Sequence, residues 1–141
     1  MACGKLGTGL ITLDSSALLA ALDSRDHHHA AIVTAIDAEP GSLIVPVSIL
    51  AEVAHFIERD LGQRALAGFI EDINASAYLL DCSDDGWLRV LELVRRYHDL
   101  PLGLADAAVI ESAERHGGRV LTLDRRHFGV VEREGTVRVL P

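Results

Sequence analysis

The amino-acid sequence predicts an α/β fold, a three-layer α/β/α sandwich around a mainly parallel central sheet. Short apolar runs alternate along the chain with longer segments in which apolar residues recur at helical spacing. Strands that are apolar on both faces and alternate with helices are typical of parallel sheets covered on both sides. The chain has 141 residues, of which 49% are hydrophobic, which suits one domain with a single core.

The first part of the chain predicts one strand and two helices. The run Leu-Ile-Thr-Leu-Asp at residues 10–14 is expected to form a buried strand. Ser15 is expected to cap the helix that follows, and Asp26 to open a second helix that Pro40-Gly41 ends.

The middle of the chain predicts two strands and three helices. Strands are expected over residues 43–45 and 78–80. Ser48 is expected to cap a helix that Gly62 ends, and an amphipathic helix follows over residues 66–73. Ser83 is expected to cap a long helix, with Asp84 and Asp85 in its first turn. Its predicted apolar face comprises Trp87, Val90, Leu91, Val94 and Tyr97.

The last part predicts one helix and two strands. The helix is expected from Ala105 to His116, where Gly117-Gly118 ends it. The strands are expected over residues 120–123 and 137–140.

Residues 1–9 show no apolar pattern and are expected to be a flexible arm or the remnant of an expression tag. The predicted domain therefore covers residues 10–141, with no second domain. No apolar run reaches 18 residues and no secretory leader is present, so a cytoplasmic protein without a membrane segment is expected. Cys3 and Cys82 form neither a disulfide framework nor a zinc pattern, which also favours a reduced compartment.

The net charge is −8, from 21 acidic and 13 basic residues. Such a balance argues against a protein that coats itself in nucleic acid. The positions of particular acids indicate a more specific role. Two apolar strands end in the same way, with Leu-Asp at Asp14 and at Asp124. Because the carboxyl ends of parallel strands meet at one edge of a sheet, these side chains are expected to lie together.

Two further acids are expected on helices at this edge. Glu52 lies about one turn into its helix, at the border of the apolar face. Asp106 lies in the first turn of a strongly apolar helix, which predicts partial burial. Taken singly, each acid has an ordinary structural explanation as a cap, a turn former or an ion-pair partner. The strand that ends at Asp81 shows that a strand-end aspartate alone proves little.

Taken together, four converging carboxylates repel one another, and a divalent cation removes that repulsion. Oxygen ligands of this kind suit Mg²⁺ or Mn²⁺, with water completing the coordination. Ser15 and Thr122 carry hydroxyls beside these acids and are expected to support ligand or water positions. A metal ion held by carboxylates suits hydrolysis of a phosphodiester.

The ordered set of motifs resembles the PIN domain family, and within it the VapC-type ribonuclease toxins. The matching segments are Leu-Asp-Ser-Ser-Ala-Leu-Leu at residues 13–19, Ser-Ile-Leu-Ala-Glu-Val at 48–53, Gly-Leu-Ala-Asp-Ala at 103–107 and Leu-Thr-Leu-Asp-Arg-Arg-His-Phe at 121–128. Each segment is weakly specific by itself, whereas the four in this order and spacing are strongly specific.

The resemblance implies a Mg²⁺- or Mn²⁺-dependent endoribonuclease toxin that cleaves RNA. It assigns the catalytic and metal-binding acids to Asp14, Glu52, Asp106 and Asp124. It also implies inhibition by a cognate VapB-type antitoxin, and a homodimer. The alternative function is an inactive or non-toxin PIN module that binds RNA or protein.

Two further features of the sequence follow Asp124. Arg125 and Arg126 directly follow Asp124, and they are candidate contacts to RNA phosphates or else solvated arginines paired with acids. His127 is either a base or RNA contact, or a surface residue beside the packed Phe128.

Overall fold

The computed structural model describes residues 9–39 and 41–141 and confirms the predicted α/β architecture. A five-stranded sheet in the order β3-β2-β1-β4-β5 lies at its centre, with all neighbouring strands parallel. The strands are β1 (Ile11–Leu13), β2 (Leu43–Pro46), β3 (Leu79–Asp81), β4 (Arg119–Leu121) and β5 (Arg138–Leu140). Residues 1–8 of the predicted arm lie outside the described residues.

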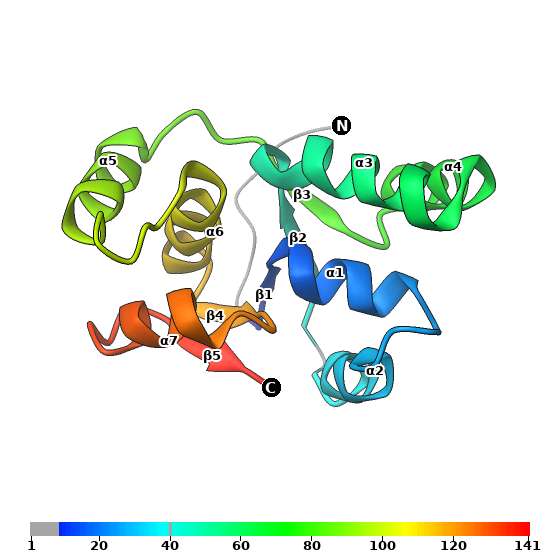
Figure 1. The fold of residues 1–141 in the computed structure, drawn as a ribbon, viewed down its shortest axis with the longest axis horizontal. Helices are drawn as coiled ribbons and strands as arrows, with labels where there is room; N and C mark the ends of the chain where they lie inside the picture. Colours follow the sequence, from blue (N-terminus) through cyan, green and yellow to red (C-terminus); the bar gives the residue numbers. More distant parts are fainter. Residues whose placement is uncertain (1–8, 40) are drawn as a thin grey trace.

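Helices cover both faces of this sheet (Figure 1). They are α1 (Ser15–Leu22), α2 (His29–Asp37), α3 (Leu50–Leu61), α4 (Gln63–Asn74), α5 (Trp87–Arg96), α6 (Leu104–Arg115) and α7 (Arg125–Glu132), with a 3-10 turn η1 (Val47–Ile49) before α3. Figure 1 shows α1 to α4 on one side of the strands, and α5 and α6 on the other. Right-handed crossovers require this arrangement, because the chain first adds strands on one side of β1 and then on the other.

The strand order reverses between β1 and β4. Open parallel sheets bind ligands at such a point, outside the carboxyl ends of the strands. The amide of Asp14 donates to the carbonyl of Leu121 at 3.0 Å, so pairing of these two strands continues to the residue after β1. The ends of β1 and β4 are thereby fixed beside each other.

The core closes tightly around the central strands. Ile11, Leu13 and Leu121 are at most 1% exposed, because helices cover both faces of the sheet. Helix α6 packs on β1, β2 and β4, and every residue from 107 to 113 is buried. A helix held this firmly gives a residue in its first turn, such as Asp106, a fixed position at the carboxyl edge of the sheet.

The prediction for α5 is wrong in its start and in part of its apolar face, since Val90 is buried and Val94 and Tyr97 pack against the core as expected. The helix begins at Trp87, because Gly86 adopts a left-handed conformation with φ of 88° and interrupts any helix running from Ser83. Its buried residues are Val90 and Leu93, whereas Trp87 is 55% and Leu91 42% exposed.

Two other helix starts differ from the sequence prediction, and one helix was not predicted. The side chain of Asp26 accepts from the amide of His28 in a turn, so α2 begins later, at His29. The helix expected from Ser48 begins as the 3-10 turn η1. The sequence prediction also missed α7, which Asp124 caps.

The expectation of two reduced cysteines involves Cys3, which lies outside the described residues. Among the described residues, no helix has the length and apolar character needed to cross a membrane.

An ion-pair network joins α5 and α6 to the turn after α7. Arg89 on α5 bonds Glu114 of α6 at 2.8 Å and Glu134 at 2.7 Å. Arg96 and the hydroxyl of Tyr97 also donate to Glu134, at 2.6 and 2.5 Å. Burial acts to raise the pKa of Glu134, but the hydrogen bonds from Tyr97, Arg89 and Arg96 prevail and lower it to about 2. The ionised Glu134 therefore stabilises the fold.

Glu134→Gln is expected to lower the free energy of unfolding at pH 7 by about 1–2 kcal/mol, because it removes a hydrogen-bonded charge. The pKa of Glu134 lies at about 2 in the folded chain against an ordinary 4.5. The stabilisation is thus complete above pH 4.5 and disappears as the pH falls towards 2. Urea unfolding at several pH values measures this loss. Glu71→Gln, at an exposed position on α4, is the control. If both variants lose the same free energy of unfolding, the ionised Glu134 does not stabilise the fold.

Candidate metal centre

Asp14 occupies the buried end of the candidate site, immediately after β1. Its side chain is only 4% exposed, and its Oδ2 accepts from Thr122 Oγ1 at 2.7 Å and from Ser16 Oγ at 2.9 Å. Burial raises the pKa of Asp14, these hydroxyls partly offset the rise, and the charge of Asp124 adds to it. Asp14 is therefore a carboxylate held rigidly in a position that disfavours its negative charge.

The hydroxyls of Thr122 and Ser16 also order the chain after β4. Thr122 Oγ1 accepts from the amide of Asp124, and Ser16 Oγ accepts from the amide of Leu123, both at 3.0 Å. Thr122 thus donates to Asp14, whereas the sequence prediction assigned its hydroxyl to a ligand or water position. The sequence prediction missed Ser16, although its position two residues after a strand-end aspartate was a usable signal.

Glu52 approaches from α3, near the start of that helix. It is exposed, and its Oε1 accepts from Ser15 Oγ at 3.1 Å. Ser15 therefore contacts Glu52, while Asp14 is held by the next residue of α1. The carboxylate of Glu52 lies at the open side of the site, where it is accessible to solvent.

Asp106 lies in the first turn of α6 and is half-buried, as the apolar sequence around it predicted. Burial raises the pKa of Asp106 to about 6, and the charges of Asp14, Asp124 and Glu52 add to the rise, while His127 acts in the opposite direction. The other three acids all lie close enough to act on Asp106 electrostatically. The structure thus brings the four predicted acids to one edge of the sheet.

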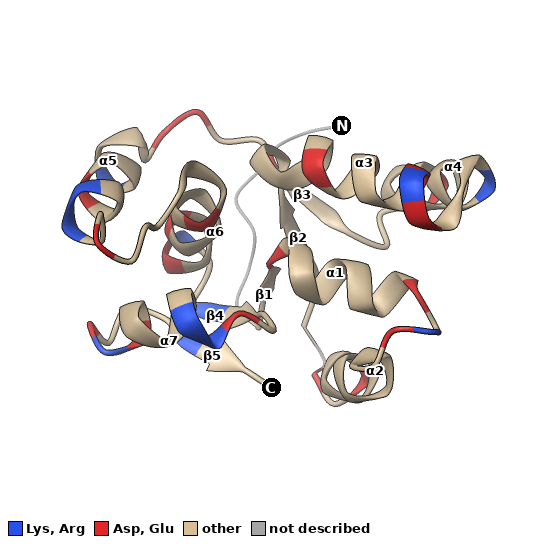
Figure 2. Ribbon diagram, viewed as in Figure 1, with Lys and Arg blue, Asp and Glu red and all other residues tan. Residues whose placement is uncertain are grey.

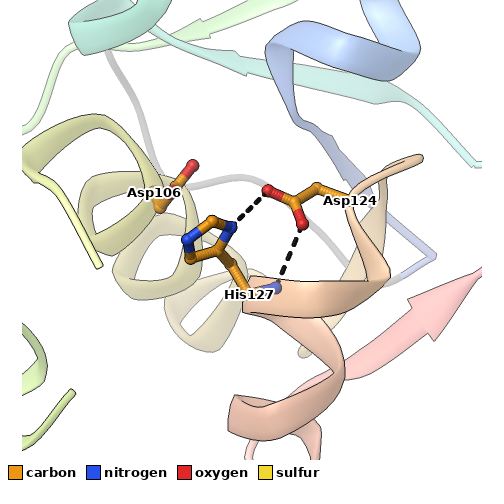
Figure 3. Close-up of side chains that lie close together, drawn as sticks. All are labelled: Asp106, Asp124 and His127. Carbon is orange, nitrogen blue, oxygen red and sulfur yellow. Dashed lines mark hydrogen bonds and ion pairs between the residues drawn. The ribbon is translucent and has the colours of Figure 1, made fainter. Parts of the chain in front are cut away.

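Asp124 caps α7 and forms two hydrogen bonds with His127 (Figure 3). Its Oδ1 accepts from the amide of His127 at 3.0 Å, and its Oδ2 lies 2.7 Å from the His127 Nδ1. Asp106, Asp124 and His127 each offer a ligand atom, and these atoms lie within 4.8 Å of one another. The sequence prediction had left His127 undecided between a functional and a surface residue.

The acid at the end of β3 provides an internal comparison. Asp81 Oδ2 bonds Arg115 Nη2 at 2.6 Å and Ser112 Oγ at 2.5 Å. Burial alone would raise the pKa of Asp81, but the bonds from Arg115 and Ser112 lower it. A strand-end aspartate with a structural role in this fold is therefore neutralised by an arginine.

The four predicted acids, at the carboxyl edge of the same parallel sheet, have no such arginine. Within residues 9–39 and 41–141, the ion pairs include none with Asp14, Glu52 or Asp106, and that of Asp124 is with His127. Figure 2 shows no basic residue on β1 or α1, the elements on either side of Asp14. The repulsion among these carboxylates is therefore left uncompensated by the chain itself.

These donors suit a divalent cation. Carboxylate oxygens arranged without a protein cation are the ligands that Mg²⁺ and Mn²⁺ prefer. Asp106, Asp124 and His127 have ligand atoms close enough together to hold such an ion, while Asp14 acts on Asp106 electrostatically and Glu52 lies at the solvent side. An ion at this position would remain open to water and to an oxygen of a substrate.

Arg125 and Arg126 are exposed at the start of α7, directly after Asp124. Arg125 Nη2 donates to the carbonyl oxygen of Pro141. Both residues thus follow Asp124 directly in the chain, and the guanidinium of Arg125 is engaged by Pro141.

Comparison with known proteins agrees with this geometry. The PIN domain family model matches residues 11–133. Ribonuclease VapC26 of Mycobacterium tuberculosis is 33% identical over 121 residues, which cover 84% of this chain and 90% of the relative.

Solved structures also show the same fold. The sarcin–ricin loop cleaving toxin VapC20 of Mycobacterium tuberculosis aligns with a TM-score of 0.73 at 15% identity, covering 85% of this chain and 94% of that one. VapBC2 of Rickettsia felis, solved bound to a DNA fragment from its promoter, aligns with a TM-score of 0.68 at 12% identity, covering 93% and 97%.

Asp106→Asn is expected to stabilise the chelator-treated protein. The pKa of Asp106 is about 6 in the folded chain against an ordinary 3.8, so ionisation above pH 6 destabilises the folded state. Allowing for its partial exposure, the gain at pH 7.5 should be about 1–2 kcal/mol, and it should disappear at pH 4, where Asp106 is protonated. Chemical denaturation in EDTA at both pH values measures the difference.

Asp99→Asn serves as the control for this measurement. The side chain of Asp99 is 94% exposed and lies away from the four acids, so the substitution should leave the free energy of unfolding unchanged. If Asp106→Asn is instead less stable than the wild type at pH 7.5, the repulsion inferred among the acids is absent.

Proposed function

Because the chain belongs to the PIN domain family, as a VapC-type protein, we propose that it is a metal-dependent endoribonuclease and the toxin of a toxin–antitoxin pair. The observation that supports this most directly is the set of four carboxylates that no arginine or lysine of the described chain neutralises. Mg²⁺ or Mn²⁺ bound there would polarise a phosphodiester and favour deprotonation of the attacking water.

The residues of the chain have distinct parts in this proposal. Asp14 is held by two hydroxyls, so it provides a ligand position that does not move. Asp106 and Asp124 hold the ion from two different helices. Glu52, at the solvent side with Ser15, is placed to orient the attacking water or a second ion.

RNA would approach across the start of α7. Arg125 and Arg126 are exposed beside Asp124, where they can contact phosphates on either side of the cleaved bond. Aromatic residues make up only 4% of the chain, so recognition would depend on the backbone and shape of the RNA more than on base stacking.

The partner proposed for this site is a VapB-type antitoxin. A basic segment of such a protein would be attracted to the uncompensated carboxylates and would block access to them. We also propose that the protein is a homodimer and acts in the cytoplasm, where its RNA substrate lies. The net charge of −8 fits these proposals, since part of it belongs to the metal centre.

Glu52→Gln and Asp106→Asn are expected to lower the rate of RNA cleavage at least about a hundredfold, because each removes a negative ligand or a base of the site. Purified, antitoxin-free protein should cleave RNA in Mg²⁺ or Mn²⁺ and lose this activity in EDTA. Sequencing of RNA 5′ ends from cells that express each variant identifies the cleaved positions.

Glu58→Gln is the matched control, since Glu58 is exposed on the same helix as Glu52 and only bonds Gln63. It should cleave RNA as the wild type does. Cleavage that persists in EDTA, or in Asp106→Asn at the wild-type rate, would refute the proposed function.

A further inference from the structure

His127 lies within the acidic cluster and has no part in the proposed cleavage. It sits in the first turn of α7, and its side chain is 20% exposed. Figure 3 shows its ring between the carboxyl groups of Asp106 and Asp124. A surface histidine beside the packed Phe128, the ordinary interpretation of the sequence, would not bring its ring among carboxylates.

The contact with Asp124 determines which ring nitrogen carries a proton. Nδ1 lies 2.7 Å from Asp124 Oδ2, and an ionised carboxylate only accepts hydrogen bonds, so Nδ1–H is the donor. In the neutral imidazole, Nε2 then keeps its lone pair. Histidines that bind metals commonly donate their other ring N–H to a carboxylate in this way, which fixes the tautomer and the ring orientation.

The spacing of the three residues suits a common ion. Their ligand atoms, with either ring nitrogen counted for His127, lie within 4.8 Å of one another. Two ligands at about 2.1 Å from one ion are about 3 Å apart when adjacent and about 4.2 Å apart when opposite. Small side-chain movements would therefore bring the ligand atoms of these residues around a single ion.

We propose that His127 is a nitrogen ligand of the divalent ion that Asp106 binds, oriented by its bond to Asp124, and that it shifts the preference of the centre from Mg²⁺ towards Mn²⁺. The inference rests on the proposed metal-dependent function. Mg²⁺ binds oxygen ligands almost exclusively, whereas later divalent metals bind imidazole more strongly. One nitrogen in an otherwise carboxylate site thus distinguishes the two ions.

Two substitutions separate ligation from simple positioning of Asp124. His127→Asn retains an N–H group near the place of Nδ1, able to donate to Asp124, but removes the second nitrogen. His127→Gln places an amide near the position of Nε2 and removes the ring. If His127 only positions Asp124, the Asn variant should behave as the wild type.

The experiment measures Mn²⁺ bound to antitoxin-free protein by electron paramagnetic resonance, with less metal than protein. The wild type should show a directly coordinated nitrogen whose coupling changes in protein labelled with [¹⁵N]histidine. The coupling should be absent in both His127 variants. Competition with Mg²⁺ should show that the ratio of Mn²⁺ to Mg²⁺ affinity falls about tenfold in His127→Asn.

His98→Asn provides the matched control, since His98 forms an exposed pair with Asp99 at 3.0 Å away from the acidic cluster. His98→Asn should keep both the nitrogen coupling to bound Mn²⁺ and the wild-type ratio of Mn²⁺ to Mg²⁺ affinity. Mn²⁺ bound by the wild type without nitrogen coupling would overturn this inference and leave the proposed function intact. If the wild type and Asp106→Asn bind Mn²⁺ equally weakly, the metal centre itself is wrong.

Discussion

Repulsion among carboxylates at the carboxyl edge of the sheet is the constraint on which the rest of the site depends. The fold brings Asp14, Glu52, Asp106 and Asp124 into electrostatic contact without a neutralising arginine or lysine in the described chain. Burial is the main cause of the raised pKa values of Asp14 and Asp106, and the charges of the neighbouring carboxylates add to the rise. Such an arrangement costs stability in the isolated chain, and a divalent cation converts the same repulsion into affinity.

The remainder of the structure offsets this cost with ordinary ion pairs. Asp81, which also ends a strand, is neutralised by Arg115 on α6. Arg89 joins α5 to α6 and to the turn after α7, and its partner Glu134 has a pKa of about 2. The acids with structural roles are therefore paired with arginines, while the acids at the proposed site are not. This division agrees with the general trade-off between stability and activity at functional sites.

The sequence was sufficient for features that depend on local pattern and on the geometry of a parallel sheet. The strands, and the convergence of Asp14 with Asp124, follow from apolar runs that end in aspartate. Features that depend on tertiary orientation were not predictable in the same way. The start of α5 depends on the left-handed conformation of Gly86, and contact of Asp14 with Ser16 depends on the rotation of α1. The place of His127 between two acids required the missed helix α7.

A site for a divalent cation formed by the four carboxylates is tested most directly by the free energy of unfolding of the chelated protein, measured against increasing Mg²⁺ at neutral pH. We expect this free energy to rise with the logarithm of the Mg²⁺ concentration above the dissociation constant, and to rise much less in Asp14→Asn. A wild-type protein whose stability does not respond to Mg²⁺ or Mn²⁺, or responds equally in Asp14→Asn, would contradict the proposed site.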